Sequence, residues 1–275
     1  MNCLPLPSLF QSLSILAIHN PCSPRALPSV RFSTSIRPHT LLKTSLTFLL
    51  FSLAIVSSAA ADHHHREVIF TDDFNGRTEV GPDYTTHAQW KGDWTVVDGV
   101  LVGKQLNPGH GATIRLFQDF TNLDMEFDFR FNGGTRWKFV VDDQNYAPVH
   151  AGHICRLSIS PKSIKVADDK TGLMDLNIRT QRQDENLPKD QRKALDAFLA
   201  TKQAEAPLDL KKGQWYKLRV VIDGDVMSAY IDGEKVTSLR SPGIAHPIKN
   251  KFGFTVNGST TEFDNIKIHR APGAK

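Results

Sequence analysis

Hydrophobic and polar residues alternate along much of the chain, most clearly at residues 123–131. In this run Met125, Phe127, Phe129 and Phe131 occupy every second position, and the positions between them hold charged side chains. Successive side chains of a β-strand point to opposite faces. The run therefore predicts a strand with one buried face and one charged face.

Shorter runs of the same kind, separated by turn residues, continue the pattern from residue 68 to residue 268. Hairpins are expected where Asp98-Gly99, Pro161-Lys162 and Asp232-Gly233 interrupt two such runs. Further strands are expected at residues 68–74, 112–117, 137–142, 215–222, 226–231, 252–256 and 263–268. Many short strands joined by Gly/Asp turns predict an all-β fold, a β-sandwich or jelly roll of two sheets.

The periodicity changes between residues 169 and 207, where the chain becomes polar. Residues 188–202 predict a helix, because Leu195, Phe198 and Leu199 follow the i, i+3, i+4 spacing and a proline precedes them. We therefore expect a short helical insertion at about residues 170–208, packed on the β-domain.

The first 61 residues have the composition of a targeting segment. They contain no Asp or Glu, and an apolar run at residues 44–56 is followed by Ser-Ser-Ala-Ala-Ala. This predicts a signal peptide region, a mature jelly-roll domain at residues 62–275, a secreted or periplasmic location, and no stable membrane association after cleavage. An uncleaved anchor and an organelle transit peptide are the alternatives. Residues 1–29 are long for a signal peptide, and one hypothesis starts translation at Val30.

Removal of the leader changes the charge of the protein. The leader holds four of the 33 basic residues and none of the 29 acidic ones, which leaves 29 of each. A neutral domain without a dense Lys/Arg block gives no reason to expect a nucleic-acid partner.

Cys155 is the one cysteine after the leader, so no intrachain disulfide is expected, and its strand-like context predicts a buried core residue.

Several runs resemble known carbohydrate-active proteins. Residues 70–74, 94–99, 213–220, 229–233 and 263–268 resemble concanavalin A-like jelly rolls and, more narrowly, the 3-keto-disaccharide hydrolase domain family. The resemblance covers residues 68–271. It implies a concanavalin A-like jelly-roll β-sandwich and cleavage of glycosides whose sugar has a 3-keto group. Residues 152–156 occupy the place of the family's Tyr-Glu-x-Gln type of strand, so no family catalytic residue is transferred.

The implied reaction needs a base, a proton donor and a group that stabilises an enolate. We expect catalytic roles for Glu126 or a histidine such as His153 as base, and for Asp128 as donor. The group that stabilises the enolate is expected to be Arg130, Lys138 or Arg156. Strand periodicity favours a shared polar face for Arg130 and Arg156. Substrate contacts are expected from Arg130, Lys138, Arg156, His110, His150 and His246.

Each of these residues also has a structural interpretation. A charged strand face is often only solvated, and loop histidines often only hydrogen-bond within the protein. His150-x-x-His153 is a weak metal signal, and no cofactor is expected. Two acidic pairs either bind Ca²⁺ or form turns at strand ends: Asp72-Asp73 and Asp168-Asp169. The His-rich residues 62–65 indicate either a Cu²⁺ or Ni²⁺ site or a polar tail.

Other function classes compete with a 3-keto-glycoside-cleaving enzyme. The acids at positions 124, 126 and 128 are similar to the strand of jelly-roll glucanases, but Arg130 stands where a third acid is needed. A non-catalytic, lectin-like carbohydrate-binding module and a structural sandwich are the remaining alternatives. Most of the tryptophans are expected in the core, and one exposed on a concave face would form a sugar-stacking platform. Carbohydrate is the expected partner.

Overall fold

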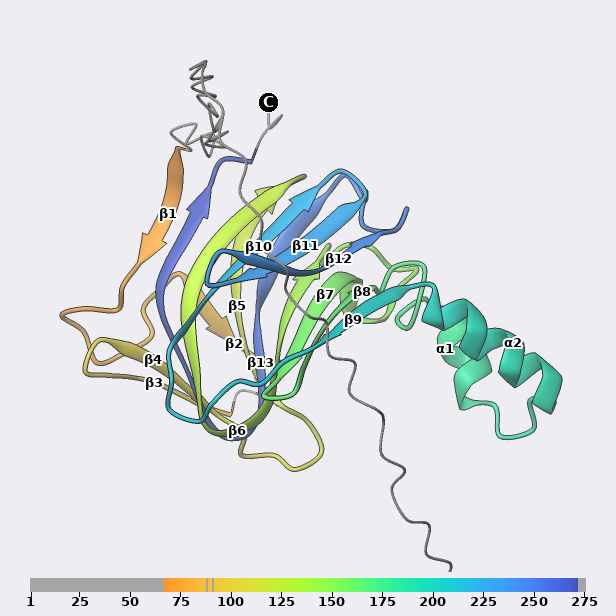
Figure 1. Ribbon diagram of the computed structural model, residues 1–275, viewed down its shortest axis with the longest axis horizontal. Helices are drawn as coiled ribbons and strands as arrows, with labels where there is room; N and C mark the ends of the chain where they lie inside the picture. The colour runs from red at the N-terminus through yellow and green to blue at the C-terminus, as the bar shows by residue number, and fades with distance from the viewer. Residues whose placement is uncertain (1–66, 88, 91, 272–275) are drawn as a thin grey trace, which may run out of the picture. The chain divides into compact units, whose positions relative to one another are not determined.

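A computed structural model of the protein describes residues 67–271 apart from residues 88 and 91 (Figure 1). The predicted leader, the Val30 start and the His-rich residues 62–65 lie outside the described residues. Within them the secondary structure is β1 Val68–Asp72, β2 Tyr84–Thr86, β3 Asp93–Val97, β4 Val100–Lys104, β5 Ala112–Phe120, β6 Leu123–Asp142, a 3₁₀ turn His150–Gly152, β7 His153–Ser160, β8 Ser163–Asp168, α1 Leu176–Gln183, α2 Lys189–Ala200, β9 Gln203–Pro207, β10 Tyr216–Asp223, β11 Val226–Ile231, β12 Glu234–Arg240 and β13 Lys249–His269.

The two longest strands are β6 with 20 residues and β13 with 21. The sequence predicted two separate strands in each of these stretches, and this part of the prediction is wrong. The register shifts at Gly133-Gly134 and Gly258 allow each strand to bend without ending. A Cβ atom on Gly133, where φ is +107°, would lie 2.1 Å from the hydroxyl oxygen of Ser259, so the bend requires glycine.

Because β6 and β13 bend, they contribute to two antiparallel sheets. The first sheet has the order β9-β8-β7-β6-β13-β5-β2 and uses the second half of β6 and the first half of β13. The second sheet has the order β12-β11-β10-β6-β13-β4-β3, with β1 also paired to β13. The predicted all-β sandwich is confirmed.

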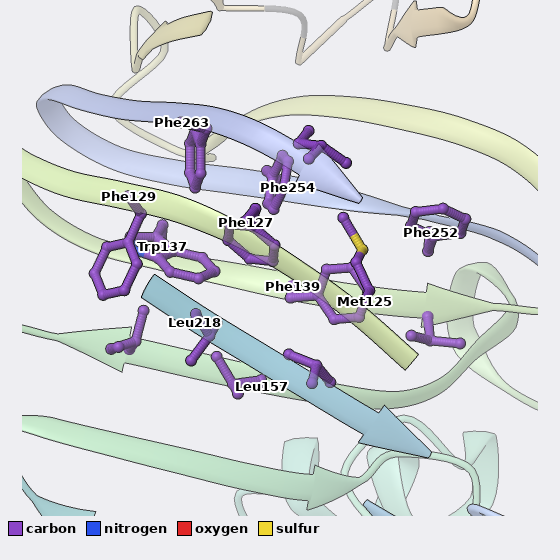
Figure 2. Packing of buried hydrophobic residues seen from close by; sticks show 14 of the residues in the cluster. Met125, Phe127, Phe129, Trp137, Phe139, Leu157, Leu218, Phe252, Phe254 and Phe263 are labelled. Carbon is purple, nitrogen blue, oxygen red and sulfur yellow. The ribbon is translucent and has the colours of Figure 1, made fainter. Parts of the chain in front are cut away.

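Aromatic side chains fill the space between the two halves of each bent strand (Figure 2). The rings of Phe129 and Trp137, from the two halves of β6, have centroids 5.1 Å apart. The rings of Phe254 and Phe263, from the two halves of β13, stack at 4.2 Å. All four side chains are fully buried, and burial of apolar area of this size is the main force that holds two sheets together.

The predicted turns and the helical segment are largely observed. Asp98-Gly99 and Asp232-Gly233 all have positive φ, as two-residue hairpin turns require. Helix α2 coincides with the predicted helix. Helix α1, which the pattern did not predict, is preceded by the N-cap Asp175, whose side chain accepts hydrogen bonds from two backbone N–H groups. Strand β9 returns the chain to the first sheet. Leu195 is buried, whereas Phe198 is exposed.

Two further features of the described residues concern the helices and the cysteine. None of the helices in residues 67–271 has the length and apolar character needed to span a membrane. Cys155 is buried and free, as predicted, and burial raises the pKa of its thiol. Buried thiols of this kind are unreactive.

Candidate functional site

A pocket of about 480 Å³ lies on the outer face of the first sheet. We call it the imidazole pocket, because four histidines line it. Its floor consists of outward-facing strand residues, and its walls come from the loops before β3, before β5 and before β7. The lining residues are Thr85, Thr86, His87, Trp90, His110, Thr113, Arg115, Phe117, Asp142, His150, Ala151, His153 and Lys251.

The central contact of the imidazole pocket joins Asp142 and His153. Nδ1 of His153 lies 2.6 Å from a carboxylate oxygen of Asp142, which is almost completely buried at the end of β6. Burial alone would raise the pKa of Asp142, but the hydrogen bond and charge of His153, with the cations Arg115 and Lys251, hold that pKa below its ordinary value. An ionised Asp142 fixes the ring of His153 and turns Nε2 away from the carboxylate.

Two cations lie beside the same carboxylate. Arg115 Nε is 3.8 Å and Lys251 Nζ is 3.4 Å from the second oxygen of Asp142. Arg115 also donates to the backbone carbonyl of Phe254 at 2.7 Å and to the Thr255 hydroxyl at 3.2 Å. These bonds hold the guanidinium flat on the sheet. The pocket floor therefore presents fixed positive charge around one buried anion.

His150 lies next to His153, with ring centroids 6.1 Å apart. A tight turn places both rings: Ala151 has φ +56°, and a Cβ atom on Gly152 would lie 2.1 Å from the carbonyl oxygen of Asp143. Partial burial, followed by the positive charge of Arg179, lowers the pKa of His150. His150 is therefore a neutral imidazole near pH 7.

An aromatic surface forms the opposite wall. The rings of Trp90 and His110 stack, with centroids 4.7 Å apart and planes inclined by 23°. The backbone N–H groups of Gln89 and Trp90 donate to His87 Nδ1 at 3.1 and 3.2 Å, which fixes the Trp90 loop. A half-buried tryptophan face of this kind is suited to stacking on the apolar face of a sugar ring.

Three of the sequence-predicted residues lie elsewhere, on the outer face of the second sheet. Lys217 Nζ and Asn265 Nδ2 donate to Asp128, each at 2.8 Å. Arg130 pairs with Glu262 and lies over the Trp215 ring, and Glu126 is 3.7 Å from His269 Nε2. The structure does not bring Glu126, Asp128 and Arg130 together with the histidines of the imidazole pocket.

The expected shared face of Arg130 and Arg156 is wrong, because β6 bends between its two halves. Arg130 precedes the bend and pairs with the second sheet, whereas Arg156 on β7 lies opposite Val140, after the bend. Lys138 and Arg156 do share the outer face of the first sheet with the imidazole pocket, but they line a neighbouring hollow. His246 is buried, between Asp143 at 2.9 Å and Lys170 at 3.0 Å, and lies outside the pocket lining.

Three residues of the pocket floor were not singled out from the sequence: Arg115, Asp142 and Lys251. Each lies in a predicted strand or directly beside one, and Arg115 and Asp142 occupy polar positions of the alternating pattern. That pattern marks them as outward-facing. Their convergence depends on the pairing of β13 with both β5 and β6, which brings distant segments together.

In each acidic pair considered for Ca²⁺ the first aspartate is occupied by protein donors, and Asp169 forms an ion pair with Arg156 Nη2 at 3.1 Å. Asp72 accepts from the backbone N–H of Phe74 and from the Tyr84 hydroxyl, both at 2.9 Å. Asp168 accepts from the backbone N–H groups of Thr171 and Gly243, at 2.9 and 3.0 Å. Across residues 67–271, no group of three or more His, Cys, Asp or Glu side chains is arranged to hold a metal ion.

Comparison with solved structures shows the fold. The chain matches an endo-β-1,3(4)-glucanase, SCLam of family GH16, with 12% identity over 74% of this chain and 91% of that chain, at a TM-score of 0.50. An endo-β-galactosidase from Clostridium perfringens matches with 12% identity over 76% of this chain and 64% of that one, also at 0.50. A sialidase matches with 12% identity and a TM-score of 0.47, over 69% of this chain and 17% of that one.

Comparison with protein families gives a match over most of the described chain. No curated protein matches the sequence. Residues 70–269 match the model of the 3-keto-alpha-glucoside-1,2-lyase-like domain, a range that includes every strand of both sheets except the first two residues of β1. Both the predicted concanavalin A-like fold and the predicted family are thus confirmed. The chain belongs to the 3-keto-alpha-glucoside-1,2-lyase-like domain family.

Proposed function

We propose that this protein cleaves 3-keto-glycosides by elimination in the imidazole pocket. A carbonyl at C3 of a sugar acidifies the proton on C2. When a base removes that proton, the electron pair forms an enolate with the carbonyl. The enolate then expels the glycosidic oxygen from C1 as the C1–C2 double bond forms, and the departing oxygen takes a proton from an acid. Addition of water across the double bond completes hydrolysis.

The observation that supports this proposal is the pair of histidines in different surroundings. His150 is neutral, with a lowered pKa, and is suited to accept the C2 proton. His153 is fixed through Nδ1 by the ionised Asp142, and is suited to donate from Nε2 to the glycosidic oxygen. One imidazole that no carboxylate of the described residues holds, beside one whose Nδ1 faces a carboxylate, offers one group for each of the two proton transfers.

The remaining lining residues support the other requirements of the reaction. Arg115 and Lys251 supply positive charge for the enolate oxygen, in a pocket where their positions are already fixed. The Trp90–His110 stack supplies a face on which the sugar ring can lie. This assignment names carbohydrate as the ligand and needs no metal.

The first test compares 3-keto-disaccharides with their unoxidised parents, followed by mass spectrometry. We expect cleavage of the keto sugars alone. His150→Ala and His153→Ala should each lower kcat by about a hundredfold to ten-thousandfold, the usual contribution of a general acid or base. The matched control is Glu126→Gln on the second sheet, which should keep full activity. Binding without cleavage of either set would favour the carbohydrate-binding module instead.

A second test separates the two histidine roles. A 4-nitrophenyl leaving group departs without help from an acid, so its 3-keto-glucoside should restore most of the activity of His153→Ala and none of that of His150→Ala. In deuterated water the His153→Ala variant should still exchange the C2 proton, because its base is intact. Exchange that is lost in His153→Ala and kept in His150→Ala would reverse the two roles.

We also propose that the protein is exported. The acid-free leader, with its apolar run at residues 44–56 and the small residues that follow, supports this location. N-terminal sequencing of the protein recovered from its source cells should give a start close to residue 62. A start at Met1 would contradict both export with cleavage and the Val30 initiation hypothesis.

A further inference from the structure

A second hollow, of about 250 Å³, lies beside the imidazole pocket on the same outer face of the first sheet. We call it the basic hollow. Four cations line it, Arg136 and Lys138 from β6, Arg156 from β7 and Lys165 from β8, with serine hydroxyls between them. The lining contains one acid, Glu205 from β9.

Strand register makes these side chains neighbours. Lys138 lies directly opposite Ser158, and Ser158 lies opposite Lys165, so a row of cation, hydroxyl and cation crosses three strands. Lys138 is half-buried in this row. On a concave surface, such a row presents several hydrogen-bond donors, in fixed positions, to one polar group of a ligand.

The positive charge of the basic hollow is only partly neutralised. Lys165 Nζ lies 3.0 Å from Glu205, and Arg156 Nη2 lies 3.1 Å from the buried Asp169. Arg136 and Lys138 have no ion-pair partner within 4.0 Å among residues 67–271. Two cations in a hollow therefore remain available for an anion from outside the chain.

The basic hollow and the imidazole pocket lie within reach of one substrate. On the neighbouring strand β13, Thr255 lies directly opposite Lys138, and the Thr255 hydroxyl accepts a bond from Arg115 of the imidazole pocket. Arg156 and Arg115 stand three strand spacings apart, about 14 Å between backbones. A substrate that extends from the imidazole pocket across β13 would therefore reach Lys138.

From this arrangement we infer that the leaving half of the substrate has an oxyanion, a carboxylate or a sulfate, which binds Lys138 and Arg136 in the basic hollow. The inference rests on the proposed function, because it names the chemical class of the substrate for that site. With a neutral glycoside bound, Lys138 and Arg136 would have no ligand charge to pair with. A charge-assisted hydrogen bond is stronger than a neutral one, so an anionic aglycone should be selected over a neutral one of the same shape.

The test uses three 3-keto-glucosides with matched aglycones: 4-hydroxybenzoate, 4-hydroxybenzenesulfonate and the neutral 4-hydroxybenzamide. The wild-type protein should prefer a charged aglycone by about tenfold in kcat/KM. Preference for the benzoate alone or the sulfonate alone identifies the oxyanion. The Arg136→Gln/Lys138→Gln variant should lose the preference, so that its kcat/KM is the same for the benzoate, the sulfonate and the benzamide. Lys235→Gln, which removes one exposed charge from the second sheet, is the matched control and should keep the preference.

A binding measurement separates this inference from the proposed function. Calorimetry with the unoxidised glucosides should show tighter binding of the charged compounds, weakened by salt and lost in the double variant. Cleavage without any charge preference would overturn the inference and leave the proposed function intact. Charge-dependent binding without cleavage would contradict the proposed function and leave the anion site in the basic hollow intact. A preference that survives in the double variant would also overturn the assignment to the basic hollow.

Discussion

The outer faces of the two sheets have similar polar residues but use them differently. On the second sheet, charged side chains face one another across neighbouring strands: Arg219 donates to both oxygens of Asp124 at 2.8 and 2.9 Å, and Asp128 accepts from Lys217. On the first sheet, His150 lies open to the imidazole pocket, and Lys138 has no ion-pair partner in the described part of the chain.

This difference separates groups that stabilise the fold from groups available to a ligand. An ion pair at a strand surface adds little stability, but it occupies the hydrogen-bonding capacity of both partners. Asp128, with bonds from Lys217 and Asn265, has little capacity left for a substrate. The bend in β6 is the physical reason that one strand supplies residues to both kinds of face.

The largest effect should come from removing the carboxylate that orients His153. We expect Asp142→Asn to lower kcat on a 3-keto-glycoside by about a hundredfold or more. The amide has no negative charge, and it cannot hold the ring of His153 in the same orientation. Asp128→Asn, the matched change on the second sheet, should leave kcat unchanged. Steady-state kinetics of the two variants make the comparison.

The stability of the Asp142→Asn variant provides the control for folding. Because the pKa of Asp142 is lowered in the folded protein, its ionised form stabilises the fold above its unfolded pKa near 3.8, and that contribution is lost as pH falls through the lower folded value. The difference in Tm between wild type and variant should therefore be largest near neutral pH and shrink in acid. Equal losses of activity in Asp142→Asn and Asp128→Asn would contradict the distinction between the two faces.

A smaller effect is expected from the two half-buried tryptophans. Trp90→Ala should raise KM by up to about tenfold with little change in kcat, because a stacking contact is worth about 0.5–1.5 kcal/mol and is made in the bound state. Trp215, which packs under Arg130 on the second sheet, supplies the matched control, and Trp215→Ala should leave KM unchanged. A larger effect on KM from Trp215 than from Trp90 would place the sugar on the other face.

The sequence predicts the strands better than it predicts the site, for a physical reason. Alternation at Met125, Phe127 and Phe129 depends on local geometry, and these residues are fully buried as expected. The same alternation marks Asp128 and Lys138 as outward-facing without saying which sheet each one joins. The family resemblance narrowed the predicted β-sandwich to a concanavalin A-like jelly roll, because the residues that carry it are mostly turns and core positions.

The pairing of Asp142 with His153 depends on strand register, which the pattern does not contain. The two residues lie opposite each other across β6 and β7, at a register shift between Val141 and Asp142. The bend of β6 at Gly133-Gly134 could not be predicted from the pattern either, because glycines within a strand pattern are compatible with both a turn and a continuous bulged strand. His153 was singled out from the sequence, whereas its carboxylate partner was not.

The smallest effect we predict concerns the pH dependence of the first-sheet site. If His150 is the base, kcat/KM should fall with decreasing pH through a midpoint below 6.5, because burial and the charge of Arg179 on α1 lower the pKa of His150. Arg179→Gln removes part of that repulsion and should move the midpoint toward higher pH while the plateau rate stays the same. Arg182→Gln removes a charge from the same helix without acting on His150 and should leave the profile in place. A midpoint that shifts in both variants, or in neither, would show that the acid limb does not report on His150.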